Sequence, residues 1–174
     1  MALIFVLTKS SCFGSKKLLE YRGWYRECMK ALELVDVLTD SKIIVASSVK
    51  IGSKKEIDCY RFAFRRLGIE NSSVEFFDYG FETISQLDFA FVMAQKRNEE
   101  LIIISTLFHF PRAWWLSRNC PVKIKHKIVF GITDIKEVLV DIALDFIFPI
   151  IDVLGCRKWF QNLTIERRQS GLRF

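Results

Sequence analysis

The sequence lacks closely spaced cysteines. Its five cysteines are scattered, and the nearest two, Cys12 and Cys28, are sixteen positions apart. This spacing excludes the common zinc motifs and the Cys-x-x-Cys redox motif. Because only two histidines are present and no carboxylate cluster lies near them in the sequence, we expect no metal site. A scattered, odd set of cysteines is typical of reduced thiols in a cytoplasmic protein, where most serve as small buried side chains.

A long uncharged apolar run is also missing. The apolar N-terminal segment is too short to cross a bilayer and has no basic segment before it, as a signal peptide would have. Residues 138–154 are more apolar, but they include Asp141, Asp145, Asp152 and Pro149, and such charges are costly in a bilayer. We therefore expect no transmembrane segment and a buried helix over residues 138–154, with binding to a membrane surface as the less favoured alternative.

No familiar catalytic or nucleotide-binding loop is present. The glycine positions of the dinucleotide fingerprint and of the P-loop are missing, and so is the Gly-x-Ser-x-Gly elbow of serine hydrolases. Residues 8–17 are rich in Ser, Gly and Lys and could place amide and ammonium groups near an anion, although an ordinary loop is the stronger interpretation. A net charge of +6 without a basic stripe argues against nucleic-acid binding.

What the sequence does contain is typical of one globular domain. Of its 174 residues, 51% are hydrophobic and 26% are charged, which excludes a disordered chain. No internal repeat, low-complexity segment or linker divides it. Aromatic residues are frequent at 14%.

Apolar runs alternate with stretches of helical spacing along the chain. The runs predict buried strands at residues 3–7, 42–47 and 74–77 and from residue 101, and a half-exposed edge strand at residues 122–132. Helices are predicted at residues 25–38, 54–67, 84–97 and 135–154 and after His109. This order predicts an α/β, Rossmann-like three-layer sandwich over residues 1–155, with a mostly parallel sheet of about five strands. Residues 156–174 are predicted to form a basic, loosely structured tail.

Helix-boundary residues accompany two of these helices. Ser53 and Glu56 have the spacing of a capping box, so Glu56 is equally well interpreted as a capping or a catalytic residue. Thr83 and Gln86 have the same spacing at the next helix. Gly68 is a typical helix end.

Polar side chains follow each of the first four predicted strands. Because the carboxyl ends of parallel strands meet at one edge of the sheet, these side chains should converge there. The expected ligand-binding residues are Arg112, Thr83, Ser48, Glu82, Ser105 and Lys9. The expected catalytic residues are His109 and Glu56.

His109 and Arg112 are the centre of this predicted site. Their spacing of three places both on one side of a helical turn. An arginine fork suits phosphate or carboxylate, and a histidine can exchange a proton near neutral pH. A lone His–Arg pair is more often a structural or ligand-binding contact than a catalytic one, and both interpretations remain open.

Three motifs in this order resemble a known family. They are Ala63 to Gly68-Ile69, then Glu82-Thr83-Ile-Ser-Gln86, and the most specific, Ser105-Thr-Leu-Phe-His109-Phe-Pro-Arg112-Ala113. The chain is thereby similar to domain-of-unknown-function family 218, the YdcF/SanA/ElyC-like proteins. The resemblance implies a Rossmann-like fold and a ligand pocket at Glu56, Thr83, His109 and Arg112. It also implies S-adenosylmethionine as a cofactor and, through membrane-anchored members, a link to cell-envelope biogenesis.

The chain departs from the family at three places. Thr8-Lys9-Ser10-Ser11 stands where the family has a Gly-rich loop, Ser47-Ser48 stands for a Ser-Gly pair, and Gln86 replaces an Asn. The His–Arg end of the pattern is intact, while the identity of the ligand is left open.

Two functions therefore follow from the sequence. The first is binding of a small anionic or nucleotide-like ligand, S-adenosylmethionine or a phosphate-bearing metabolite, at the carboxyl ends of the strands, with no reaction specified. The second is a non-enzymatic interaction or regulatory module, in which the aromatic residues and the basic tail form a surface for an acidic protein or a membrane.

Overall fold

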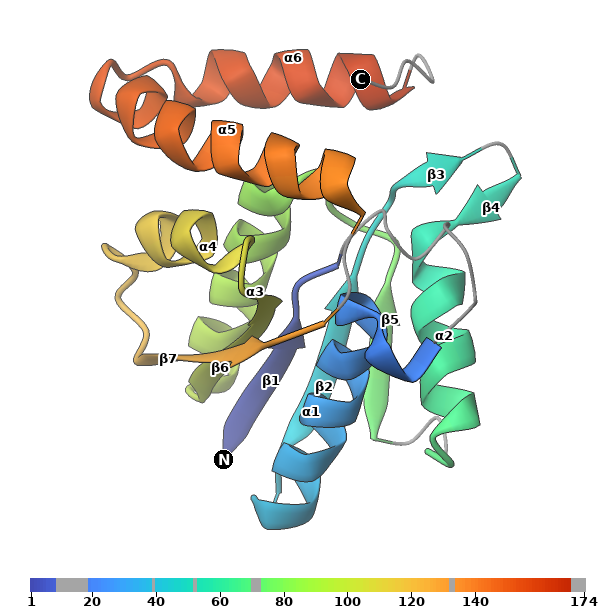
Figure 1. Cartoon of the computed structure of the whole chain (residues 1–174). Helices are drawn as coiled ribbons and strands as arrows, with labels where there is room; N and C mark the ends of the chain where they lie inside the picture. Colours follow the sequence, from blue (N-terminus) through green and yellow to red (C-terminus); the bar gives the residue numbers. More distant parts are fainter. Residues whose placement is uncertain (9–18, 39, 52, 70–72, 132–133, 170–174) are drawn as a thin grey trace.

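A computed structural model describes residues 1–8, 19–38, 40–51, 53–69, 73–131 and 134–169. Its centre is a five-stranded sheet in the order β5-β2-β1-β6-β7, with every neighbouring pair parallel. The strands are β1 (Ala2–Val6), β2 (Lys42–Ala46), β5 (Val74–Phe77), β6 (Glu100–Thr106) and β7 (Ile124–Val129). The predicted parallel sheet is confirmed, and its most apolar strands, β1, β2 and β6, occupy the inner positions (Figure 1).

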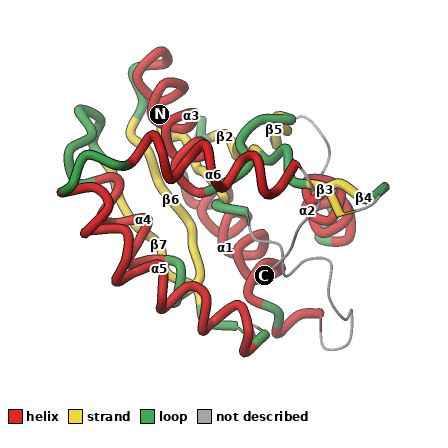
Figure 2. The backbone as a smooth tube through the Cα atoms, turned by 90° about the horizontal axis from the view of Figure 1, so that it is seen from above, coloured by secondary structure: helices red, strands yellow, loops and turns green. Residues whose placement is uncertain are grey.

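Helices cover both faces of the sheet, as a three-layer sandwich requires (Figure 2). One face packs against α1 (Gly23–Val37) and α2 (Glu56–Arg66), and the other against α3 (Thr83–Arg97) and α4 (Phe110–Ser117). Successive side chains of a strand point to opposite faces. Ile4 and Val6 accordingly join the core under α1 and α2, and Leu3 and Phe5 join the core under α3 and α4.

The start of the second helix differs from the prediction. A short antiparallel hairpin precedes it, formed by β3 (Lys50–Ile51) and β4 (Lys54–Lys55), and β4 occupies the first two residues of the predicted helix. Because this pairing keeps the backbone extended, α2 begins at Glu56, and its N-cap residue makes no side-chain capping bond. The predicted Ser53–Glu56 capping box is therefore wrong. The helix ends at Arg66, and Gly68, with a φ of +83°, follows its C-cap residue Leu67, as a helix-terminating glycine does.

The cap of the third helix also differs. Glu82, not Thr83, is the N-cap of α3, because its carboxylate accepts from the backbone N–H groups of Ile84 at 2.5 Å and Ser85 at 2.6 Å. The Ser85 hydroxyl completes the capping box. Gln86 therefore does not cap the helix as predicted, and its side-chain amide instead donates a hydrogen bond to Thr8, just beyond β1.

Two C-terminal helices lie across the end of the sheet towards which the strands point (Figure 1). They are α5 (Ile135–Val153), whose N-cap is Asp134, and α6 (Arg157–Gln169). The predicted loosely structured tail is wrong over α6. Gly155, at a φ of +70°, separates the two helices, and Phe160 then packs on Phe148 with ring centroids 5.0 Å apart. The remaining residues of the predicted tail, 170–174, lie outside the described part of the chain.

The prediction that residues 138–154 form a buried helix is also wrong. Within α5 only Asp141 and Phe148 are buried. The helix is docked along one side and leaves most of its apolar side chains exposed.

Among the described residues, Cys28, Cys120 and Cys156 are free thiols, and Cys12 lies outside the described residues. Burial, with a smaller contribution from Glu27, raises the pKa of the Cys28 thiol well above its ordinary value. Thiolate is the reactive form, so we expect iodoacetamide at pH about 8 to modify exposed Cys156 in the native protein and Cys28 only after unfolding in guanidinium. Peptide mass spectrometry measures both, and equal labelling of the two in the native protein would contradict this placement.

Candidate functional site

The candidate site lies at the carboxyl ends of the three inner strands. Ser47 follows β2, Thr8 lies two residues beyond β1, and Thr106 ends β6. All three side chains are buried. The first residues of α2, α3 and α4 reach the same edge, because each of these helices follows one of the strands. The predicted convergence of polar residues at one sheet edge is what the fold produces.

The Glu56 carboxylate anchors one half of the site. Its Oε2 accepts hydrogen bonds from Thr8 Oγ1 at 2.6 Å and from the Ser47 hydroxyl. Thr8 Oγ1 in turn accepts from Gln86 Nε2 at 2.8 Å. Glu56 is 1% exposed, and charge-assisted bonds of this kind are what hold a carboxylate in a buried place. This network ties the ends of β1 and β2 to α2 and α3.

His109 anchors the other half. It is buried at the N-terminus of α4, and Pro111 in the first turn suits the start of that helix. His109 Nε2 lies 2.9 Å from Oγ1 of Thr83, the first residue of α3. Gln86 is three residues further along α3, on the same side of the helix, so α3 brings the His109 and Glu56 halves together.

Arg112 lies one turn after His109 and is also buried, at 5% exposure. Its Nη2 makes an ion pair with Asp141 Oδ1 of α5 at 3.2 Å, and its guanidinium group lies 5.5 Å from the centre of the Phe148 ring. Within the described part of the chain, Nε and Nη1 of Arg112 meet no hydrogen-bond acceptor. Buried polar groups are normally hydrogen-bonded, so this guanidinium group has donors to spare.

Two hydroxyl groups at the end of β6 also have unused hydrogen-bonding capacity. Ser105 Oγ and Thr106 Oγ1, at the end of β6, are fully buried and have no hydrogen-bond partner among the residues that the structure describes. Ser105 lies on the α3 and α4 side of the sheet, the side of Leu101 and Ile103. The end of β6 thus offers hydrogen-bonding capacity beside the helix that carries His109 and Arg112.

Three of the predicted ligand-binding residues are placed differently. Ser48 donates its backbone N–H to the Gly80 carbonyl at 2.9 Å. It lies near Asp78, whose pKa is lowered mainly by the hydrogen bond with Lys55 and to a smaller extent by Ser48. The Glu82 carboxylate caps α3 and also accepts from Gln161 Nε2 of α6 at 3.2 Å. Lys9 lies outside the described residues. The structure therefore brings Glu56, Thr83, Ser105, His109 and Arg112 to the edge and gives Ser48 and Glu82 local structural contacts.

Sequence reasoning missed three residues of the site, Thr8, Gln86 and Asp141, whereas Ser47 is one of the polar residues that follow the second predicted strand. Thr8 carries the signal used for the others, because it follows a buried strand. Gln86 was assigned to a cap. Asp141 carries no such signal, since it is 29 positions from Arg112 on a helix that looks generally apolar.

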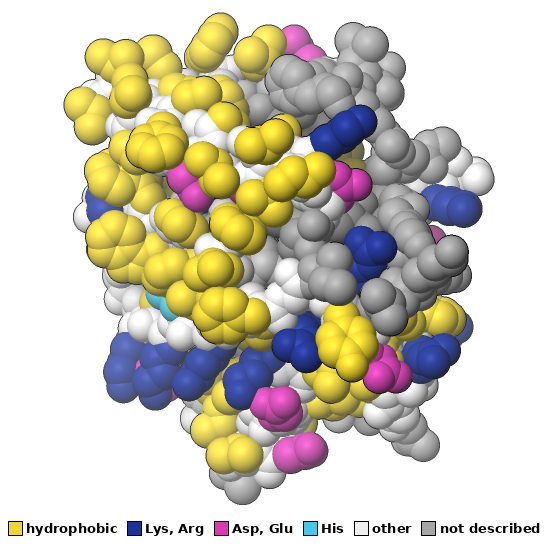
Figure 3. Space-filling model, viewed as in Figure 1, with side chains coloured by type: hydrophobic (Ala, Val, Ile, Leu, Met, Phe, Trp, Pro, Cys, Tyr) yellow, Lys and Arg dark blue, Asp and Glu magenta, His cyan; other side chains and the backbone are white. Residues whose placement is uncertain are grey.

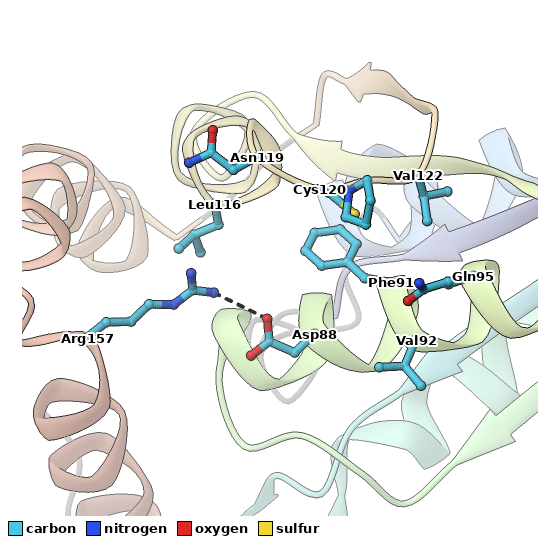
Figure 4. Close-up of a pocket in the computed structure, with 10 residues that line it drawn as sticks. Asp88, Phe91, Val92, Gln95, Leu116, Asn119, Cys120, Val122 and Arg157 are labelled. Atoms are coloured by element: carbon cyan, nitrogen blue, oxygen red, sulfur yellow. Dashed lines mark hydrogen bonds and ion pairs between the residues drawn. The ribbon is translucent and has the colours of Figure 1, made fainter.

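A separate shallow pocket of about 210 Å³ lies between α3, the segment after α4 and the start of α6 (Figure 4). Arg157 reaches across it to Asp88, with Nη2 3.2 Å from Oδ1. Burial raises the pKa of Asp88 and outweighs Arg157, which acts to lower it. None of the predicted site residues lines this pocket, so it is distinct from the strand-end site.

Neither a cluster of metal-binding side chains nor a membrane-spanning helix is found among the described residues. No three His, Cys, Asp or Glu side chains among the described residues come together as a metal site would need. No described helix combines the length and the apolar character needed to cross a membrane.

Comparison with protein-family models, with curated proteins and with solved structures found no match for the chain.

Proposed function

We propose that the chain binds a small anionic or nucleotide-like ligand at the carboxyl ends of β1, β2 and β6, with Arg112 as the anion-binding residue. The observation that carries the proposal is the buried guanidinium group whose Nε and Nη1 have no acceptor among the described residues. A buried donor left without an acceptor costs about 1 to 3 kcal/mol, and more where the group is charged. A ligand carboxylate or phosphate would recover that energy through two parallel hydrogen bonds.

Asp141 supports this role. By pairing with the guanidinium group from the α5 side, Asp141 fixes the position of Arg112 before a ligand binds. The single contact through Nη2 leaves the other donors of the fork available. A fork held from one side is preorganised, and preorganisation lowers the entropy lost on binding.

The remaining polar groups supply hydrogen bonds and a proton. Thr83 fixes the His109 ring through Nε2, so that His109 would orient the ligand or exchange a proton with it. Ser105 and Thr106 would donate hydrogen bonds to ligand oxygens. Glu56 would contribute indirectly, by positioning the hydroxyl groups of Thr8 and Ser47, which donate to its carboxylate. These positions overlap those implied by the YdcF-like resemblance, which supports S-adenosylmethionine, bound through its carboxylate, or a phosphate-bearing metabolite. A link to cell-envelope biogenesis is supported by that resemblance alone.

The proposal is tested by calorimetry and thermal unfolding with S-adenosylmethionine, mononucleotides, sugar phosphates and inorganic phosphate. We expect at least one of these to bind and, at a hundred times its dissociation constant, to stabilise the native protein by about 2.7 kcal/mol. Arg112→Lys keeps a positive charge beside Asp141 but removes the fork, so its affinity should be at least tenfold lower.

Arg118→Lys is the matched control, because Arg118 is an arginine at the end of the same helix that pairs with Asp152 of the same partner helix. It should bind the ligand as the wild type does. The site assignment is wrong if no compound in the panel binds, or if Arg112→Lys and Arg118→Lys have the wild-type affinity alike.

A further inference from the structure

Helix α5 turns its aspartate side chains towards the protein. Asp141 pairs with buried Arg112, and Asp152 accepts hydrogen bonds from Trp115 Nε1 at 3.1 Å and Arg118 Nη2 at 3.0 Å. Asp145 is half-buried on the same side of the helix. The side of α5 that carries carboxylates, normally the solvated one, is therefore its docking side.

The opposite side of α5 is apolar and faces outwards. From residue 139 to residue 154, every exposed side chain is apolar. The most exposed are Phe146 at 74% and Val153 at 77%, together with Leu139, Ile150 and Leu154, and Trp159 continues the surface on α6. In Figure 3 hydrophobic side chains gather in the region where Figure 1 places α5, with a few acidic side chains among them.

This face is larger than the apolar surface that a monomer usually exposes. Ten or so half-exposed or more exposed large side chains amount to on the order of 1,000 Å² of apolar surface, whereas the largest patch of a typical monomer is about 300 to 600 Å². No described helix could cross a bilayer, so a membrane-spanning role does not account for it.

Positive charge borders the face. Lys123, Lys125 and Lys127 alternate along the exposed side of β7, with Glu100 as the one carboxylate that pairs with the first two. In Figure 3 a dark blue band lies directly below the hydrophobic face, where Figure 1 places β7. Apolar side chains beside a row of lysines, with the carboxylates of the helix turned away, complement the surface of an anionic bilayer.

The composition of the face also distinguishes a bilayer from a protein partner. Protein interfaces carry about ten hydrogen bonds, and these fix the register of the two partners. Between residues 139 and 154 the exposed side chains offer no donor or acceptor. Trp114 and Trp159, both more than half exposed, are of the residue type that settles at the boundary between headgroups and acyl chains.

We propose that the outward face of α5, continued on α6, lies in the interface of an anionic phospholipid bilayer, with the β7 lysines against the headgroups. The helix then lies parallel to the membrane plane, and the apolar side chains reach the boundary of the acyl chains. This proposal does not depend on the ligand proposed for Arg112.

The test is co-sedimentation of the full chain with vesicles of phosphatidylcholine, with and without phosphatidylglycerol. We expect binding to the vesicles that contain phosphatidylglycerol, weakened by salt, and at least tenfold weaker binding to phosphatidylcholine alone. Phe146→Asp should reduce binding at least tenfold. Val37→Asp is the matched control, because Val37 is equally exposed, at 76%, but lies at the end of α1. It should bind as the wild type does.

Light scattering after size exclusion gives the oligomeric state of each variant, and circular dichroism shows whether the variant is folded. A folded Phe146→Asp chain that still binds the vesicles would overturn the proposal, and so would equal binding to both kinds of vesicle. A dimer that is lost in Phe146→Asp, without any vesicle binding by the wild type, would assign the face to a second copy of the chain instead.

Discussion

Arg112→Met is expected to lower the free energy of unfolding by about 3 to 5 kcal/mol. The substitution removes one partner of a buried ion pair, and the buried Asp141 carboxylate loses its bond with the guanidinium group. Urea unfolding without any ligand measures the loss. The effect on stability is separate from ligand affinity, which is why the milder Arg112→Lys serves for the binding experiment.

The double variant Arg112→Met/Asp141→Leu is the control for this interpretation. Replacing both partners of a buried pair by apolar side chains of similar volume is often close to neutral, so most of the lost stability should return. If the double variant is no more stable than Arg112→Met alone, the cost comes from lost packing of Arg112 against Phe148 and not from the loss of the ion pair with Asp141.

Glu56→Ala is expected to cost about 3 to 5 kcal/mol, because two buried hydroxyl groups lose a charged acceptor and each such bond contributes about 1.5 to 3 kcal/mol. Both hydroxyls donate to the same oxygen, Oε2. The amide oxygen of Glu56→Gln can take that place, so this variant should lose only about 1 kcal/mol. Chemical denaturation of the two variants gives the comparison.

Asp58→Ala is the matched surface control on the same helix. Its carboxylate is more than half exposed and pairs only with Arg61 one turn away, so its removal should cost less than about 1 kcal/mol. A Glu56→Ala loss as small as that of Asp58→Ala would contradict the network at the strand ends.

The sheet could be predicted from the sequence because its inner strands are buried on both faces. Residues with that burial must be apolar without interruption, and such runs are easily read from a sequence. The alternation of lysines with less exposed residues in β7 placed that strand at the edge for the same reason. Gly68 marked a helix end because its backbone has a positive φ, which glycine adopts without strain.

Contacts between distant polar residues could not be predicted in this way. Asp141, Asp145 and Asp152 form one stripe along α5, and Arg112, Trp115 and Arg118 form one stripe along α4. Either stripe alone suggests a solvated face. Only the docking of the two helices shows that they satisfy each other, and that α5 consequently turns its apolar side outwards.

Two smaller errors have local causes. The β3 and β4 strands have two residues each, too few to show any period, and they displaced the start of α2. Helix α6 is rich in polar and basic residues, and its docking through Phe160 and Gln161 was not visible in its composition.

The position of β1 at the centre of the sheet bears on how the chain is made. Ala2 pairs with Glu100, so β1 leaves the ribosome about a hundred residues before its second neighbour, β6, has been synthesised. Until then, β1 can be covered on one side only, by β2. Pairings this far apart in sequence slow folding and leave an apolar strand edge open during synthesis. The nascent chain is therefore most prone to aggregate in the interval between the synthesis of β2 and that of β6.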